Sequence, residues 1–147
     1  MTKKYKILSH TADLRLEVFG KTIEELFKNS AEALTKILSP KTIKSGTRNQ
    51  ELVTKVSIES ANINTLLVDF LNEILAKSQI NKSVYELMSL RVDEDKIKVE
   101  AELTGVPVSE FEEDVKAVTY HEVDIKKELG TRNKGQGVWK TKLVIDI

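Results

Sequence analysis

The sequence has no cysteine, only two prolines, and a single tryptophan among its 147 residues. Without cysteine the chain forms no disulfide and no metal site built on thiolates. It also lacks an excess of charge of either sign, because 23 lysines and arginines balance 23 aspartates and glutamates. This balance gives no overall basic footprint for tight, unaided binding of nucleic acid, although a local basic face is compatible with it.

Long apolar runs are absent as well. No stretch approaches the roughly 18–20 apolar residues that a membrane-spanning helix needs. The charged start, Met1–Lys6, is not followed by an apolar segment of signal-peptide length. We therefore expect a cytoplasmic protein that has no membrane partner. The length suits one domain with a real core, and we assign residues 1–147 to it.

Two segments have the apolar spacing of amphipathic helices. The first, Thr22–Leu38, opens on a threonine with a glutamate three residues later, which is the pattern of a capping box. It ends before Ser39–Pro40, because proline disfavours helical backbone in the residue before it. The second is Ile63–Ser78, and either Asn62 or Asn64 can cap its start.

Alternation of apolar and polar residues predicts strands through most of the remaining chain. The predicted strands are Tyr5–Ser9, Asp13–Phe19, Leu52–Ile58, Val84–Val92, Lys96–Leu103, Ala117–Lys126 and Val138–Ile147. A break is expected at Gly105–Val108, and loops at Lys41–Gln50 and Gly130–Gly137. The pattern indicates an α+β fold, with two helices packed on one side of a mainly antiparallel sheet system.

The segment Val115–Ile125 carries more chemistry than a strand needs for folding. Its apolar positions alternate like a strand, yet the run includes one lysine, one tyrosine, one histidine and two carboxylates. Such a concentration of ionisable groups indicates a site or a surface that meets a partner. Two further clusters, Ser9–Asp13 and Val144–Ile147, lie near the two ends of the sequence.

Asp13 and Asp146 are candidate metal ligands. A carboxylate before a strand is often only an acceptor for nearby turn N–H groups, and this plain role suits Asp13. Asp146 is less easily explained, because a carboxylate at the end of an apolar strand is costly if it is buried unpaired. If the two carboxylates and the terminal carboxylate of Ile147 come together, they form an oxygen-rich site for a hard cation.

Lys116 and the two histidines are each compatible with an ordinary structural role or with a functional one. Lys116 is either a solvated lysine or a partner for an acidic or phosphate group. His10 and His121 are each able to serve as a general base or a ligand. Because no serine or cysteine nucleophile motif surrounds them, structural hydrogen bonding is favoured for both. For Tyr120 we expect half-buried packing on the sheet, with the hydroxyl at its rim.

Four blocks of the sequence, in order, resemble the archease family across nearly the whole chain. They are Ser9–Asp13 followed by Gly20–Phe27, then Leu67–Glu73, then Val115–His121, and finally Ile145–Ile147. One departure is Ile74–Ser78, where archeases usually carry a more aromatic run. The resemblance assigns Asp13 and Asp146 to metal binding, with Ile147 adding a backbone or terminal oxygen, and makes Lys116 a functional position.

The resemblance implies an accessory protein and not an enzyme. Archeases assist the GTP-dependent RNA ligase of transfer-RNA splicing, promoting its guanylylation and its repeated turnover. The implied cofactor is one divalent cation, calcium first, with magnesium or manganese as alternatives, and RNA is met only through the ligase. Two other functions stay open: a metal-dependent phosphate-ester hydrolase, which should gather more ligands than these, and a chaperone-like binding module without a metal.

Overall fold

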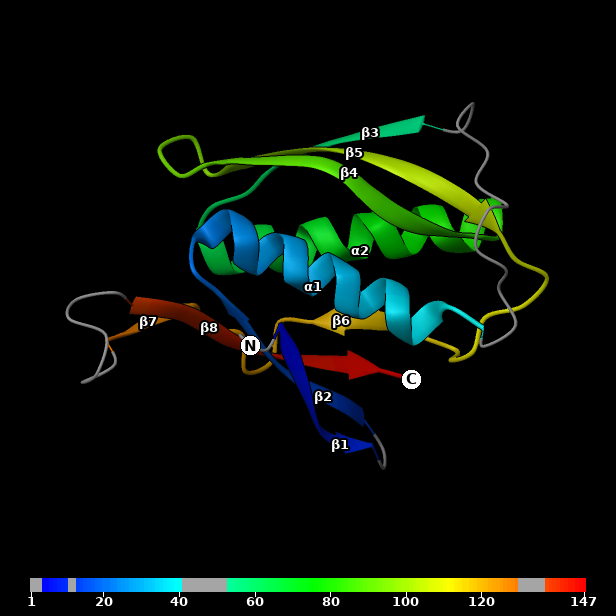
Figure 1. Ribbon diagram of the computed structural model, residues 1–147, viewed down its shortest axis with the longest axis horizontal. Coiled ribbons are helices and arrows are strands. Elements are labelled where there is room, and N and C mark those ends of the chain that lie inside the picture. Colours follow the sequence, from blue (N-terminus) through cyan, green and yellow to red (C-terminus); the bar gives the residue numbers. More distant parts are fainter. Residues whose placement is uncertain (1–3, 11–12, 41–52, 130–136) are drawn as a thin grey trace.

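Two antiparallel sheets enclose a layer of two helices in the computed structural model (Figure 1), which describes residues 4–10, 13–40, 53–129 and 137–147. The first sheet has the order β1-β2-β8-β6, with β7 also paired to β8. The second sheet has the order β3-β5-β4. The strands are β1 (Tyr5–His10), β2 (Asp13–Gly20), β3 (Val53–Glu59), β4 (Ser83–Asp93), β5 (Lys98–Pro107), β6 (Ala117–Thr119), β7 (Lys126–Leu129) and β8 (Gly137–Asp146).

The helices begin where local capping signals place them. In α1 (Ile23–Leu38), Thr22 Oγ1 accepts from the Glu25 N–H at 3.0 Å, and the Glu25 carboxylate accepts from the Lys21 N–H at 3.1 Å. In α2 (Ile63–Asn81), Asn62 is the N-cap, since its Oδ1 accepts from the Thr65 N–H at 2.9 Å. The second helix runs past the predicted end at Ser78 and stops at Lys82, whose backbone is left-handed with φ 47°.

The α+β class, with two helices on antiparallel strands, is confirmed, but the expected single-sided packing is wrong. The two sheets cover opposite sides of the helix layer (Figure 1). The reason lies in α1, where ten of 16 residues are buried, more than one apolar stripe provides. A helix buried on such a wide face needs cover from both sides, and α1 packs against β2 of one sheet and β4 of the other.

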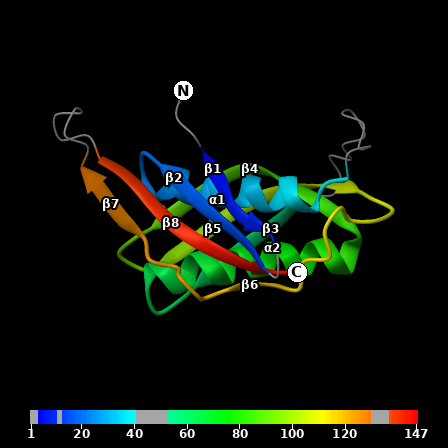
Figure 2. The same cartoon turned by 90° about the horizontal axis from the view of Figure 1, so that it is seen from below.

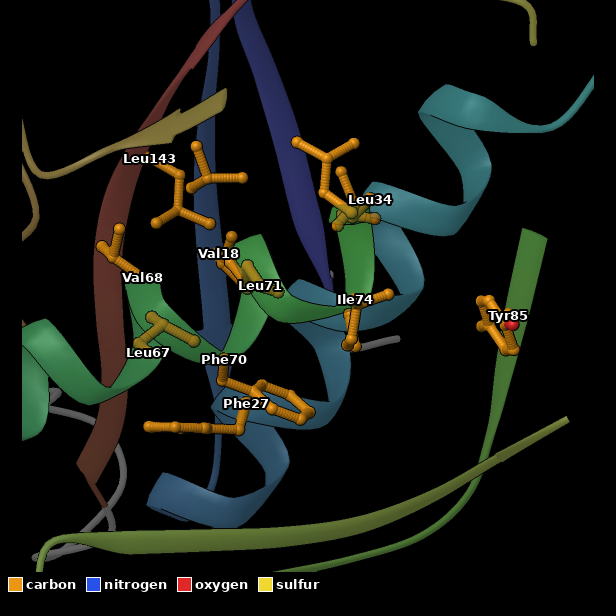
Figure 3. Packing of buried hydrophobic residues seen from close by; sticks show 14 of the residues in the cluster. Val18, Phe27, Leu34, Leu67, Val68, Phe70, Leu71, Ile74, Tyr85 and Leu143 are labelled. Carbon is orange, nitrogen blue, oxygen red and sulfur yellow. The ribbon is translucent and has the colours of Figure 1, made fainter. Parts of the chain in front are cut away.

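One hydrophobic cluster joins both helices to both sheets. At its centre the rings of Phe27 on α1 and Phe70 on α2 lie 6.0 Å apart between centroids, tilted by 32° (Figure 3). Leu143 and Val18 reach this core from the first sheet and Tyr85 from the second (Figure 3). The five-stranded sheet is therefore fixed through its inner face, which leaves its outer face for solvent or a partner.

Two of the predicted strands differ from the observed ones by more than two residues at a boundary. The strand expected over Ala117–Lys126 is wrong, because β6 ends at Thr119 and the chain turns away, with Glu122 at φ 66°, before β7 begins at Lys126. The break expected at Gly105–Val108 is also misplaced, because β5 continues to Pro107. Gly105 is tolerated inside the strand because it lies under Tyr85, where an added Cβ would stand 3.0 Å from the ring.

The expected loop over Lys41–Gln50, and most of the one over Gly130–Gly137, lie outside the described residues. Within the residues that the structure describes, neither helix is both long and apolar enough to cross a membrane.

Candidate functional site

The strand register brings Asp13 and Asp146 together. Asp13 is the pairing partner of Asp146 between β2 and β8, and Ala117 pairs with the same Asp146 between β6 and β8. Residues directly opposite one another point to the same face of a sheet. The neighbours of the two aspartates, Leu14 and Ile145, are buried against the helices, so both aspartates lie on the outer face. Figure 2 views this sheet from below and shows β8 between β2 and β6.

This pair of carboxylates fits the implied cation. Asp13 is exposed and Asp146 partly exposed. The Cβ atoms of such cross-strand partners lie about 4.5–5.5 Å apart, close enough for two carboxylates to share one ion at oxygen distances of about 2.3–2.6 Å. Ile147 follows Asp146 directly, so its main-chain oxygens lie within one residue of the pair along the chain. The donors are all oxygens, the ligand type that calcium and magnesium prefer.

The side-chain ligand set is small. Within the described residues, no group of three or more histidine, cysteine, aspartate or glutamate side chains is arranged to hold a metal. A cation at the Asp13–Asp146 pair would therefore keep positions open for water or for groups of a partner. A two-metal hydrolase would need more side-chain ligands than this pair alone provides.

Lys116 lies next to the Asp13–Asp146 pair through a backbone contact. Its main-chain N–H donates to the Asp146 carbonyl at 2.8 Å, so Lys116 and Ala117 both lie opposite Asp146, as in a β-bulge. Its side chain is exposed. In the described part of the chain, no carboxylate forms an ion pair with the Lys116 ammonium group. Two carboxylates and an exposed lysine thus stand at one end of the sheet.

Arg15 and Glu122 tie the turn after β6 onto the same outer face. Arg15 Nε donates to Glu122 Oε2 at 3.0 Å, and a second guanidinium nitrogen contacts both carboxylate oxygens. This hydrogen bonding lowers the pKa of Glu122 below its usual value and raises the pKa of Arg15. Arg15 stands two residues after Asp13, and so its positive charge lies near the Asp13–Asp146 pair. The Glu122 carboxylate offsets much of that charge.

The two histidines do not form a common site. His10 ends β1, where its backbone pairs with Leu14, whereas His121 lies exposed in the turn after β6. The strand order puts β1 and β6 three strand spacings apart, about 14 Å. The His121 main-chain N–H donates to Thr119 Oγ1 at 3.3 Å. The structural roles that we expect for the two imidazoles stay predictions.

Tyr120 differs from the expectation of half-buried sheet packing. It follows the last residue of β6 and is 55% exposed. Its hydroxyl donates to Asp69 Oδ1 on α2, and this hydrogen bond raises the pKa of the tyrosine. Asp69 also accepts from Ser60 Oγ at 2.7 Å. The tyrosine therefore anchors the turn to a helix and does not pack on the sheet.

Sequence reasoning missed the polar residues of α2 that contact the Val115–Ile125 segment. They are Asn64, Asp69, Asn72 and Gln79. Polar side chains on a helix usually face solvent, so their presence alone carries no signal. One signal was present: these polar residues lie among apolar positions of α2 that are buried, such as Val68 and Leu75.

Comparison with known proteins finds relatives over nearly the whole chain. The model of the Archease protein family matches residues 5–147. An archease of Methanosarcina mazei is 32% identical, covering 99% of this chain and 97% of its own length. An archease of Pyrococcus abyssi is 28% identical, with 99% of each chain covered. The solution structure of Methanobacterium thermoautotrophicum protein 1598 superposes with a TM-score of 0.68 over 99% of this chain and 100% of that one, at 22% identity, and so shares the fold.

Proposed function

The chain belongs to the archease family, and we propose that it is an accessory protein that activates a GTP-dependent RNA ligase of transfer-RNA splicing. It would act by promoting guanylylation of the ligase and its repeated turnover. The observation that supports this most directly is the cluster of Asp13, Asp146 and Lys116 at one sheet end, in which Asp13 and Lys116 are exposed and Asp146 is partly exposed. Its groups are charged and accessible, yet no nucleophile motif accompanies them.

The proposed chemistry is electrostatic and positional. Transfer of a phosphoryl-type group depends mainly on placing the reacting groups and stabilising their charge. The exposed Lys116 ammonium is a mobile positive charge that suits a triphosphate oxygen in the ligase pocket. Asp13, Asp146 and a main-chain oxygen of Ile147 would hold one divalent cation, calcium first with magnesium or manganese as alternatives. When bound, that cation supplies further positive charge for the nucleotide.

The balanced charge of the chain suits an accessory role. With 23 positive and 23 negative side chains, the protein offers little general attraction for RNA, so the ligase would hold the RNA. In this scheme the attacking histidine belongs to the ligase, and His10 and His121 need no catalytic role. We place the protein in the cytoplasm with the ligase.

The test is guanylylation of the ligase with GTP, followed in the presence and absence of this protein. We expect wild type to stimulate, and Asp13→Ala, Asp146→Ala and Lys116→Ala each to lose at least about tenfold of the stimulated rate, about 1.4 kcal/mol of transition-state stabilisation. Lys55→Ala is the matched control, since Lys55 is an exposed lysine on β3 of the other sheet. Absence of stimulation by wild type would refute the function. Full stimulation by all three variants would point to a binding module instead.

A further inference from the structure

Strand β6 is short and lies at an edge of its sheet, but the side that is not paired with β8 is covered. Edge strands normally leave backbone N–H and C=O groups without partners. Here the Asn72 side chain on α2 accepts from the Val118 N–H at 2.9 Å and donates to the Val118 carbonyl at 2.8 Å. One amide side chain thus makes both hydrogen bonds that a neighbouring strand would make to this residue.

Other side chains of α2 continue this pattern along the Val115–Ile125 segment. Gln79 Nε2 donates to the Val115 carbonyl at 2.7 Å. Toward the start of the helix, Asp69 accepts from the Tyr120 hydroxyl, and Asn64 Oδ1 accepts from the Ile125 N–H at 2.8 Å. The segment therefore runs antiparallel to the helix and is held at both ends and in the middle. Three of the four side chains bond to the backbone of the segment, and Asp69 bonds to a side-chain hydroxyl.

Asn72 and Gln79 contact the backbone on either side of Lys116. Val115 and Val118 are 1% and 2% exposed, and the backbone of each accepts a hydrogen bond from α2. Between them, the Lys116 N–H is fixed to the Asp146 carbonyl. The backbone on both sides of Lys116 is thus clamped between α2 and β8, while its side chain stays exposed.

We propose that Asn72 is a positioning residue, which acts through Lys116 by holding the β6 backbone so that the Lys116 side chain projects beside the Asp13–Asp146 pair. This inference rests on the proposed function of that site. Without the amide, the Val118 N–H and C=O lose their partners on one side, and the segment gains freedom to shift. Displacements of about 1 Å at an acting group can reduce a rate about a hundredfold.

The test combines Asn72→Ala with Lys116→Ala in the guanylylation assay. We expect Asn72→Ala to lower maximal stimulation at least about fivefold, and to lower it no further when Lys116 is already alanine. Asn81→Ala is the matched control, because Asn81 is an α2 asparagine that donates instead to the Tyr85 hydroxyl. Exchange of the Val118 amide hydrogen should accelerate in Asn72→Ala and not in Asn81→Ala. All variants are compared at a temperature where circular dichroism shows them folded.

Several outcomes separate this inference from the proposed function. If wild type gives no stimulation, or Lys116→Ala stimulates fully, the proposed function fails and the positioning role fails with it. If those two results are as expected but Asn72→Ala matches wild type, or its loss adds in full to that of Lys116→Ala, only the positioning role is overturned. Should Asn72→Ala not fold, Asn72→Asp serves in its place, because it retains the acceptor for the Val118 N–H and loses the donor. Reduced stimulation by Asn72→Asp supports the role, and full stimulation overturns it.

Discussion

Asp13 on β2 and Asp146 on β8 are directly opposed partners in an antiparallel pair of strands. Like charges in such positions are destabilising, whereas opposite charges or a shared cation would stabilise the pair. The main-chain register fixes this opposition, with eight consecutive residue pairs between β2 and β8. The chain thus holds two carboxylates together on a face where folding alone does not need them.

Asp13→Asn should weaken calcium binding while relieving repulsion in the calcium-free protein. We expect at least a tenfold rise in the calcium Kd by calorimetry, and a free energy of unfolding in EDTA that rises by about 0.2–1 kcal/mol. Glu17→Gln is the control, since Glu17 lies on the same face of β2 and opposes Lys142 instead of a carboxylate. An unchanged calcium isotherm for Asp13→Asn would exclude the site.

The Arg15–Glu122 ion pair should make stability depend on pH in a defined direction. Its hydrogen bonds lower the pKa of Glu122 in the folded protein, so the pair stabilises the fold above the usual glutamate pKa and loses this effect as pH falls through the lowered value. We expect Glu122→Gln to lower stability toward urea at neutral pH, and the difference from wild type to shrink at an acidic pH well below the usual glutamate pKa. Glu94→Gln, in the β4–β5 turn, should show no such convergence. An equal deficit at both pH values would contradict the role of the pair.

The parts of the fold that local chemistry determines could be predicted from the sequence. Thr22 and Asn62 cap the helices with their own side chains, so the start of each helix is encoded within a few residues. The end of β6 is different. The chain leaves the sheet after Thr119 because Asp69 and Arg15, both distant in sequence, hold Tyr120 and Glu122. Alternation in Ala117–Lys126 carries no information about those contacts.

The candidate site was predictable only in part. Asp146 drew attention as a carboxylate at the end of an apolar strand, but its pairing with Asp13 depends on strand register, which the two local sequences do not specify. At the level of sequence, only the resemblance to a family links the two residues. Asn72 gave no signal of its own, because its importance comes from the free edge of β6 and not from the helix that carries it.

Gly20, at the junction of β2 and α1, should not tolerate a side chain. A Cβ there would lie 2.4 Å from the Leu26 nitrogen and 2.8 Å from its Cα, and backbone atoms of a helix cannot move aside cheaply. We expect Gly20→Ala to lower the free energy of unfolding by about 3 kcal/mol. At Gly137 the corresponding Cβ would meet the side chain of Lys127, which can rotate away. Gly137→Ala should therefore cost less than about 1 kcal/mol in the same chemical denaturation experiment. Equal losses for the two variants would contradict this explanation.

Ser78 and Ser30 are both buried serines on helices, but their hydroxyls differ in hydrogen bonding. The Ser30 hydroxyl donates to the Leu26 carbonyl at 2.8 Å, whereas the Ser78 hydroxyl has no hydrogen-bond partner within the described residues. A buried hydroxyl without a partner has lost its hydration and gained nothing in exchange. Ser78→Ala removes that cost and favours the helix, so we expect the free energy of unfolding to rise by about 1 kcal/mol. Ser30→Ala breaks an existing bond and should be neutral or destabilising by up to about 1 kcal/mol. Urea unfolding of both variants measures the difference, and a loss of stability in Ser78→Ala would show that its hydroxyl is satisfied in solution.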